Sequence, residues 1–306
     1  PIETSQKSGV KFVDTGLNGA AITSDGKIVV YGGHSKDSGR DIDSIKKDLV
    51  DIDQIIHNRT SFAALKKDGS VISWGGFATQ SESTKNRLSK NVDKLFASHD
   101  AYAAIKKDGS VVLWGVISDD NRRIDAEIKG KYTNIFPQAQ SFVLQKEDGS
   151  IEIHGDSHTQ QSFKGVFVDV LTANEHLGNG KGSTFAALKA DGSVITFGGN
   201  TNASHPVLNL LGNGVEKIFS NEGNFAALKN DGSLIVWNIY NQTFLNYDKN
   251  SAEFKNTQEK VLKVETYSDH LHFLTDQNNL FYVNISNSSS LITRKVSSQV
   301  KDFYFQ

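Results

Sequence analysis

The chain of 306 residues contains no cysteine, which excludes disulfide bonds and thiol chemistry. It has only three prolines, and no stretch approaches the roughly 20 consecutive apolar residues of a membrane-spanning helix. Residues 1–8 lack the apolar core of a secretory signal. A formal net charge of −2 gives no long-range field to attract nucleic acid or an anionic membrane. We therefore expect no membrane insertion, no nucleic-acid partner and a cytoplasmic location by default; non-classical release or delivery as an effector is the alternative.

What the chain does contain is one repeated sequence motif. Residues 62–75 read Phe-Ala-Ala-Leu-Lys-Lys-Asp-Gly-Ser-Val-Ile-Ser-Trp-Gly, and close copies occupy 102–115, 185–198 and 225–238. Weaker copies stand at 19–32, 142–155 and 271–284. The turn glycine falls at 26, 69, 109, 149, 192 and 232, with Asn278 in the seventh slot. A period of roughly 40–45 residues is typical of one four-stranded propeller blade.

The pattern inside the unit favours strands over helices. Asp-Gly between two apolar runs predicts a tight hairpin turn, and the run that follows it is β-branched and aromatic. Another apolar stretch precedes each hairpin, as at 92–96, 132–136 and 215–219, and a short apolar segment such as 208–211 lies further upstream. Four strand candidates in each of seven units predict an all-β protein, a seven-bladed β-propeller of four-stranded antiparallel blades.

Both ends of the chain resemble the start of a repeat. Residues 300–305 match the opening strand of a further unit, and residues 9–13 occupy the same slot at the beginning. We therefore expect one propeller domain over residues 1–306, with the ring closed by pairing of the terminal strands. The alternative is that the chain is a piece of a longer protein.

The unit Phe-Ala-Ala-Leu-Lys-x-Asp-Gly-Ser-Val-x-x-Trp-Gly-Gly resembles the repeat of the regulator of chromosome condensation superfamily, in the short tandem form common in bacterial proteins. The resemblance covers residues 9–306 and implies a seven-bladed propeller. For function it implies several classes, among them guanine-nucleotide exchange factors for small GTPases, chromatin binders and bacterial effectors. Eukaryotic members usually continue with Gly-Gln-Leu-Gly, whereas residues 77–80 here read Phe-Ala-Thr-Gln. This departure counts against exchange activity.

No arrangement of residues indicates catalysis. The histidine pairs 270/272 and 154/158 match no established metal spacing, and the chain has no nucleophile elbow or phosphate-binding loop. We predict no catalytic residue, metal or cofactor, and hence no enzyme. One slot of the repeat holds large aromatics, interpreted either as sugar-stacking platforms or, preferably, as packing between blades: Tyr31, Trp74, Trp114, Phe197 and Trp237, with His154 as the odd member. Lysine pairs at 66–67 and 106–107 flank the turns and are interpreted as solubilising.

Candidate binding residues lie in the loops between the first and second strands of each unit. These loops are polar and differ from unit to unit, which would suit one asymmetric partner held by a rigid scaffold. The predicted partner-binding residues are His57, Asn58, Arg59, His99, Asp100, Gln138, Gln140, Glu175, His176, Asn221, Glu222, Asn224, Asp269 and His270. The sequence thus predicts a non-catalytic scaffold that binds a protein through one loop face. The alternatives are a glycan-binding propeller lectin and an exchange-factor-like effector acting on a small GTPase.

Overall fold

The structure is a computed structural model. It describes residues 11–14, 18–23, 27–32, 42, 45–58, 60–117, 122–138, 141–155, 161–173, 184–198, 206–221, 223–238, 244–247, 259–267, 270–284, 292–297 and 299–301. The chain divides into two compact units, Pro1–Phe163 and Lys164–Gln306. Among the described residues, no helix has the length and apolar character needed to cross a membrane.

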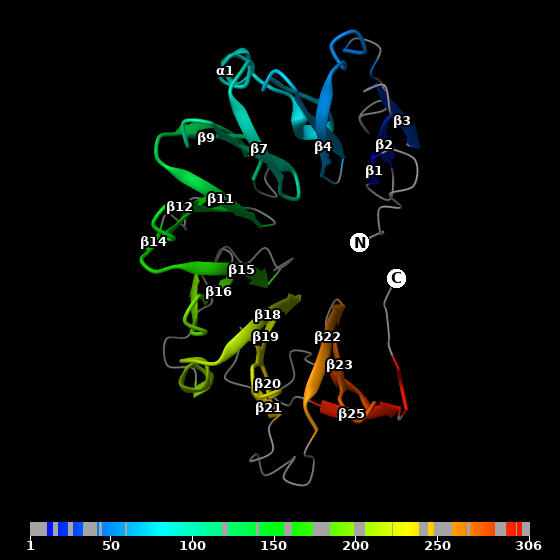
Figure 1. Ribbon diagram of the computed structural model, residues 1–306, viewed down its shortest axis with the longest axis vertical. Helices are drawn as coiled ribbons and strands as arrows, with labels where there is room; N and C mark the ends of the chain where they lie inside the picture. Colours follow the sequence, from blue (N-terminus) through cyan, green and yellow to red (C-terminus); the bar gives the residue numbers. More distant parts are fainter. Residues whose placement is uncertain are drawn as a thin grey trace. The chain divides into compact units, whose positions relative to one another are not determined.

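The first unit contains four antiparallel sheets in chain order (Figure 1). The first sheet consists of β1 (Lys11–Asp14), β2 (Asn18–Ile22) and β3 (Ile28–Gly32), and the second of β4 (Ile52–His57), β5 (Ser61–Lys66) and β6 (Val71–Gly75). The third consists of β7 (Val92–Ala97), β8 (Ala101–Lys106), β9 (Val111–Val116) and β10 (Arg123–Ile128). The fourth consists of β11 (Tyr132–Pro137), β12 (Ser141–Lys146), β13 (Ile151–Gly155) and β14 (Ser162–Phe163).

The second unit contains three more antiparallel sheets. The fifth sheet consists of β15 (Phe167–Ala173), β16 (Thr184–Lys189) and β17 (Val194–Gly198). The sixth consists of β18 (Val215–Asn221), β19 (Asn224–Lys229), β20 (Leu234–Asn238) and β21 (Phe244–Tyr247), and the seventh of β22 (Val261–Tyr267), β23 (His270–Thr275), β24 (Leu280–Asn284) and β25 (Ile292–Ser297). One antiparallel sheet for each of the seven repeats confirms the all-β class and matches the strand content of a seven-bladed propeller.

Among the described residues, the predicted fourth strand is present in four of the sheets. In the second sheet, helices η2 (Gly76–Ala78) and α1 (Glu82–Arg87) occupy the chain after β6 instead. Ser81 begins α1 as an N-cap, because its Oγ accepts a hydrogen bond of 3.0 Å from the amide of Thr84. Residues 208–211, expected as a strand, form part of helix η3 (Pro206–Leu210) and the bend after it. Val207 and Leu211 are both buried there.

The Asp-Gly turns have the conformation that the sequence predicts. Five turn glycines have φ between 79° and 85°, and Asn278 in the seventh slot has φ 61°, so the one non-glycine is a residue type that tolerates this region. Within each unit, the carbonyl of the turn glycine at 69, 109, 192 and 232 accepts a hydrogen bond from the first residue of the following sheet. Examples are Val92 N to Gly69 O at 2.9 Å and Tyr132 N to Gly109 O at 3.0 Å. The turn therefore both closes its own hairpin and joins neighbouring sheets.

The same contact recurs at the end of the described chain. Val300 N donates to Asn278 O at 3.0 Å, and Gln299 has the positive φ that Asp51 and Asn91 have just before their sheets. Residues 299–300 thus repeat the geometry that opens a sheet, as the sequence match indicated. The predicted pairing of the terminal strands depends on residues 1–10 and 302–306, which lie outside the described residues, so ring closure stays a prediction.

Within each unit, the core lies between the faces of successive sheets. Each Ala-Ala pair sits on the second strand of its sheet and divides between two cores, since alternate side chains of a strand point to opposite faces. Ala63 packs in a cluster with Tyr102 of the third sheet, whereas Ala64 packs in a cluster with Ala20 and Ile22 of the first. All eight alanines of the four close copies are buried, so both faces of these strands are covered.

Candidate functional site

The predicted partner-binding residues lie where the first strand of a sheet turns into the second. Eight of the fourteen are described, and all eight occupy or adjoin such a turn. They are His57, Asn58, His99, Asp100, Gln138, Asn221, Asn224 and His270. The other six, Arg59, Gln140, Glu175, His176, Glu222 and Asp269, lie outside the described residues. We call this end of each sheet the tip end. Whether it binds a partner stays a prediction.

In the first unit, Asn58 has a structural role at the tip end. Its buried Oδ1 accepts hydrogen bonds from the amide of Ser61 at 3.0 Å and from Ser61 Oγ at 2.6 Å. Ser61 Oγ in turn lies 3.0 Å from the hydroxyl of Tyr102 in the third sheet. Burial of that hydroxyl raises the pKa of Tyr102. Asn58 therefore helps to fasten the second sheet to the third.

In the second unit, three more predicted residues take part in a similar connection. Asn238 Nδ2 donates to Asn224 Oδ1 at 2.8 Å, Asn224 Nδ2 donates to Asn221 Oδ1 at 3.0 Å, and Asn221 Nδ2 donates to the carbonyl of His270 at 3.2 Å. This series runs from the sixth sheet to the seventh. Asn238 stands where the other close copies of the repeat have glycine, so the repeat motif itself does not supply its side-chain amide.

His99 is more accessible than these residues. Its imidazole is 45% exposed, and Nδ1 lies 3.2 Å from the Asp100 carboxylate. The Asp100 carbonyl accepts a hydrogen bond of 2.9 Å from the amide of Val116, which anchors the tip to β9. Of the described tip residues, His99 thus offers an exposed polar group, whereas Asn58, Asn221 and Asn224 are engaged in joining sheets.

At the opposite end, each of six sheets has a β-bulge at the second residue of its first strand. The pairing of β4, β7, β11, β15, β18 and β22 with the following strand skips that residue. Each skipped residue is exposed, as expected because a bulge re-aims a side chain. We call these the bulge residues: Asp53, Asp93, Thr133, Val168, Glu216 and Leu262. We call this end, which also carries the Asp-Gly turns, the bulge end.

The sequence contains a signal for these bulges, although a search for strictly alternating apolar residues would miss it. The inward residues of each first strand stand three apart, as in Val92-Asp93-Lys94-Leu95 and Tyr132-Thr133-Asn134-Ile135, rather than two apart. The burial pattern follows this spacing, with the first and fourth residues buried. A three-residue spacing at the same place in six repeats would have located the bulges.

Exposed aliphatic side chains gather at the bulge end. Among the described residues, six large aliphatics are strongly exposed, and four of them lie within two residues of the start of a first strand. These four are Val50 (44% exposed), Val166 (55%), Val168 (53%) and Leu262 (61%). The last three belong to the second unit. Single exposed aliphatics are ordinary, but the recurrence of Val166, Val168 and Leu262 at one structural position distinguishes the bulge end of the second unit.

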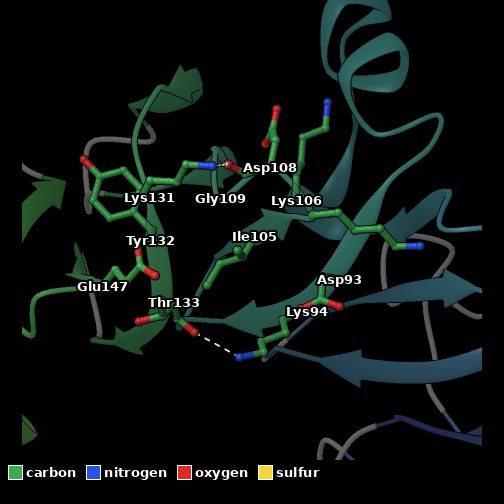
Figure 2. A pocket seen from close by; sticks show the side chains of 11 residues that line it. Asp93, Lys94, Ile105, Lys106, Asp108, Gly109, Lys131, Tyr132, Thr133 and Glu147 are labelled. Carbon is green, nitrogen blue, oxygen red and sulfur yellow. Dashed lines mark hydrogen bonds between the residues drawn. The ribbon is translucent and has the colours of Figure 1, made fainter.

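In the first unit, the bulge end contains a groove of about 420 Å³ between the third and fourth sheets (Figure 2). Its lining includes the bulge residues Asp93 and Thr133. Two lysines reach across it: Lys94 Nζ donates to the Thr133 carbonyl at 2.9 Å, and Lys131 Nζ donates to the Asp108 carbonyl at 3.2 Å. The remaining lining residues are Ile105, Lys106, Lys107, Gly109, Tyr132 and Glu147. None of the residues predicted from the sequence to bind a partner lines this groove.

The charges of the groove are mixed. Four lysines stand against three carboxylates, those of Asp93, Asp108 and Glu147. Hydrogen bonds from the Ser110 hydroxyl and amide lower the pKa of Asp108, which keeps it ionised and directs it towards its own turn. The side chain of Lys106 lies on the opposite face of β8 from Ile105 and runs away from the groove, and its charge helps to lower the pKa of Glu127.

Tyr132 connects the groove to a cluster of titratable groups on the fourth sheet. Its hydroxyl donates to Glu152 Oε2 at 2.6 Å, and Glu152 also forms an ion pair with Lys146 and lies 3.6 Å from His154 Nε2. Burial lowers the pKa of His154, although the nearby carboxylate opposes the shift. The pKa of Glu152 is itself lowered, since its hydrogen bonds to Lys146 and Tyr132 outweigh the cost of burial.

The aromatic slot is a packing position, as preferred from the sequence. Trp74, Trp114 and Trp237 are 6%, 1% and 3% exposed. Trp74 stacks on Phe62 and Trp114 on Tyr102, each with ring centroids 5.4 Å apart. Buried tryptophans offer no platform to a sugar, so the glycan alternative gains no support here. His270 and His272 each pack edge-on against Tyr282, and the described residues contain no cluster of three or more His, Asp or Glu that could hold a metal ion.

Comparison with known proteins identifies similar folds and no family. No protein-family model matches the chain, and no curated protein matches it. Solved structures similar to it include Prp20p from Saccharomyces cerevisiae (12% identity, 94% of this chain and 77% of that one, TM-score 0.44) and human WBSCR16 (13%, 84% and 78%, 0.42). Hsv2p from Kluyveromyces lactis is a third (11%, 95% of each chain, 0.41). Prp20p is the yeast RCC1 protein, but likenesses this weak say nothing of function, and membership of that superfamily stays a prediction.

Proposed function

We propose that this protein is a non-catalytic scaffold that binds another protein through the bulge end of its sheets. The observation that carries the proposal is the recurrence of the bulge. Six sheets use the same backbone irregularity to turn one side chain outward, and the six side chains include acidic, hydroxyl and aliphatic types. Equivalent positions with different chemistry suit one asymmetric partner better than a repeated small ligand.

The exposed aliphatics support the choice of a protein as partner. Val166, Val168 and Leu262 lie on sheets of the second unit and are each more than half exposed. Burying such side chains against a partner contributes about 1.5–3 kcal/mol for each residue that becomes fully covered. Aliphatic groups bordered by polar ones are typical of protein contacts.

The bulge end is the opposite end of the sheets from the loops that the sequence indicated. The reason for preferring it is the use already made of the tip side chains. Asn58, Asn221 and Asn224 belong to series of hydrogen bonds that connect neighbouring sheets, so a partner could recruit them only by breaking those hydrogen bonds. The aliphatic bulge residues Val168 and Leu262 are exposed and have no side-chain hydrogen bond for a partner to break.

The test compares three variants of the full chain in affinity capture, with captured proteins identified by mass spectrometry. The first carries Val168→Asp and Leu262→Asp. The second carries Val296→Asp, a matched control because Val296 is 56% exposed but lies on the outer strand β25. The third carries His57→Ala and His99→Ala at the tip end. Thermal unfolding of each variant verifies that the fold is retained.

We expect one protein to be captured by the unaltered chain, by the Val296 control and by the tip variant, and to be lost from the Val168/Leu262 variant. Loss from the tip variant with retention by the bulge variant would show that the partner binds the loop face instead. Capture of no common protein by the three competent forms would contradict the scaffold proposal itself.

A further inference from the structure

We propose that the bulge end of the second unit binds an extended segment that carries one lysine or arginine between two aliphatic side chains. This inference rests on the proposed function and deepens it, because it assigns a chemistry to the part of the partner that meets the fifth, sixth and seventh sheets. Its basis is the identity of the three successive bulge residues, which are Val168, Glu216 and Leu262. An acidic side chain thus stands between two aliphatic ones.

The three bulge residues form a row because their sheets follow one another within one unit. β15 lies beside β18, and β18 lies beside β22 (Figure 1). The Val215 amide donates to the Gly192 carbonyl and the Val261 amide donates to the Gly232 carbonyl, each at 2.9 Å. These two hydrogen bonds fix the residue just before the bulge against the turn of the preceding sheet. The bulge residues of the sixth and seventh sheets therefore stand at equivalent places.

All three side chains of the row are accessible to a partner. Val168 is 53% exposed and Leu262 is 61% exposed, and the Glu216 side chain on the sheet between them is also exposed. Val166, two positions before Val168, is 55% exposed and adds a second aliphatic group at the fifth sheet. The apolar area that a partner could cover thus lies at the two ends of the row, and the charge lies in the middle.

The charge of Glu216 points to a cationic group on the partner. Its carboxylate forms no hydrogen bond or ion pair with a described residue. The four lysines on the first and second strands of these sheets each contact another group: Lys217 the Phe219 ring, Lys229 the Leu210 carbonyl, Lys189 the Phe167 ring and Lys263 the Glu265 carboxylate. A lysine or arginine of the partner would therefore complement a carboxylate that these lysines do not engage.

The spacing of the row favours a segment of the polyproline II type. Sheets packed face to face stand about 10 Å apart, so the row offers one contact about every 10 Å. A polyproline II chain has about three residues per turn and rises about 3.1 Å per residue, so every third side chain points the same way at intervals of about 9 Å. An α-helix would also direct side chains three and four residues from each contact towards the sheets, whereas the row offers one bulge side chain per sheet.

The experiment measures fluorescence anisotropy of the labelled peptide Leu-Pro-Pro-Arg-Pro-Pro-Leu with the full chain. One comparison peptide has Gln in place of Arg, and another has a single Pro on each side of Arg. The protein variants are Glu216→Gln, Val168→Asp with Leu262→Asp, and a Glu147→Gln control. Glu147 is matched to Glu216 because it is an exposed carboxylate in the other unit and forms no ion pair with a described residue. Thermal unfolding of each variant verifies that the fold is retained.

We expect the unaltered chain to bind the Arg peptide about 1.5- to 5-fold more tightly than the Gln peptide, the range of exposed ion pairs, and less tightly as salt is raised. Glu216→Gln should weaken binding of the Arg peptide by the same factor and leave binding of the Gln peptide unchanged. The Val168/Leu262 variant should bind the Arg peptide more than about tenfold more weakly, because it loses the aliphatic contacts. Glu147→Gln should leave binding unchanged.

Four results would overturn the inference: no binding of the Arg peptide, equal binding of the Gln peptide, an equal loss in the Glu147 control, or equal binding of the peptide with single prolines. The proposed function fails separately, through the affinity capture. If the Val168/Leu262 variant loses the captured protein while the Arg peptide does not bind the unaltered chain, the scaffold stands and the chemistry assigned to the segment is wrong.

Discussion

The glycine that follows the aromatic slot offers the sharpest test of how these sheets are built. Gly115 has φ 115°, a conformation that L side chains rarely adopt. A Cβ at this position would lie 2.6 Å from Ala101 Cα and 2.7 Å from the Asp100 carbonyl oxygen. Both are backbone atoms of the tip, and that same carbonyl accepts the amide hydrogen bond of Val116. Gly115→Ala would therefore force the hairpin apart where it is anchored.

Two contributions set the size of the expected loss in the free energy of unfolding. Holding a non-glycine residue in a sparsely populated backbone region costs about 1–3 kcal/mol. Displacing closely packed neighbours costs about 1–3 kcal/mol more. The free energy of unfolding should therefore fall by about 2–6 kcal/mol, with relaxation of the tip determining the position within that range.

The assay is urea unfolding followed by tryptophan fluorescence, since Trp114 directly precedes the changed residue. Gly212→Ala is the matched control: a Cβ there meets nothing within 4 Å, and no positive φ is involved. The control should be neutral or stabilise the fold by about 0.4–1 kcal/mol, because alanine restricts the unfolded chain. Equal unfolding free energies for the two variants would refute the packing described at this glycine.

Three further predictions concern hydrogen bonds and titration. Ser73→Ala should destabilise the fold by about 1–3 kcal/mol, because Ser73 Oγ accepts from the Trp114 indole at 3.2 Å and donates to a buried backbone carbonyl at 2.6 Å; urea unfolding checks this, and a change under a few tenths would contradict it. Glu152→Gln should lower the pKa of His154 further, since the carboxylate now opposes the effect of burial; an upward shift in an NMR titration would contradict this. Acid should weaken the fold through the turn aspartates, because hydrogen bonds from serine hydroxyl and amide groups lower the pKa of these carboxyl groups. The stabilisation is therefore complete above the unfolded-state pKa of about 4, and it is lost as the pH falls through the folded-state pKa. The urea midpoint should drop between pH 5 and pH 3, and by less in Ser110→Ala; an unchanged midpoint would contradict it. The aspartates are Asp68, Asp108, Asp148, Asp191 and Asp231.

The repeat made much of the fold predictable because its signals are local. An Asp-Gly pair between apolar runs specifies a hairpin without reference to the rest of the chain, and even the degenerate seventh copy keeps a residue that tolerates positive φ, Asn278. The aromatic slot was also readable, since a large side chain on a strand with apolar neighbours is most simply satisfied by burial. The fourth, outer strand of each unit was harder to predict from the sequence. After β6 the sequence instead contains a capped helix, whose position depends on packing against the third sheet.

The candidate site could not be read in the same way, because accessibility is not a local property. Asn58, Asn221 and Asn224 have the composition of a binding loop, but the neighbouring sheet decides that they are engaged in hydrogen bonds. Asp93 and Thr133 look like ordinary polar strand residues until the pairing of the strands shows that both are skipped and both border one groove. The sequence by itself determined seven antiparallel hairpin units, since turn chemistry and apolar spacing act over a few residues. Only the tertiary structure decided which polar side chains hold sheets together and which stay exposed, because that depends on contacts between residues about forty positions apart.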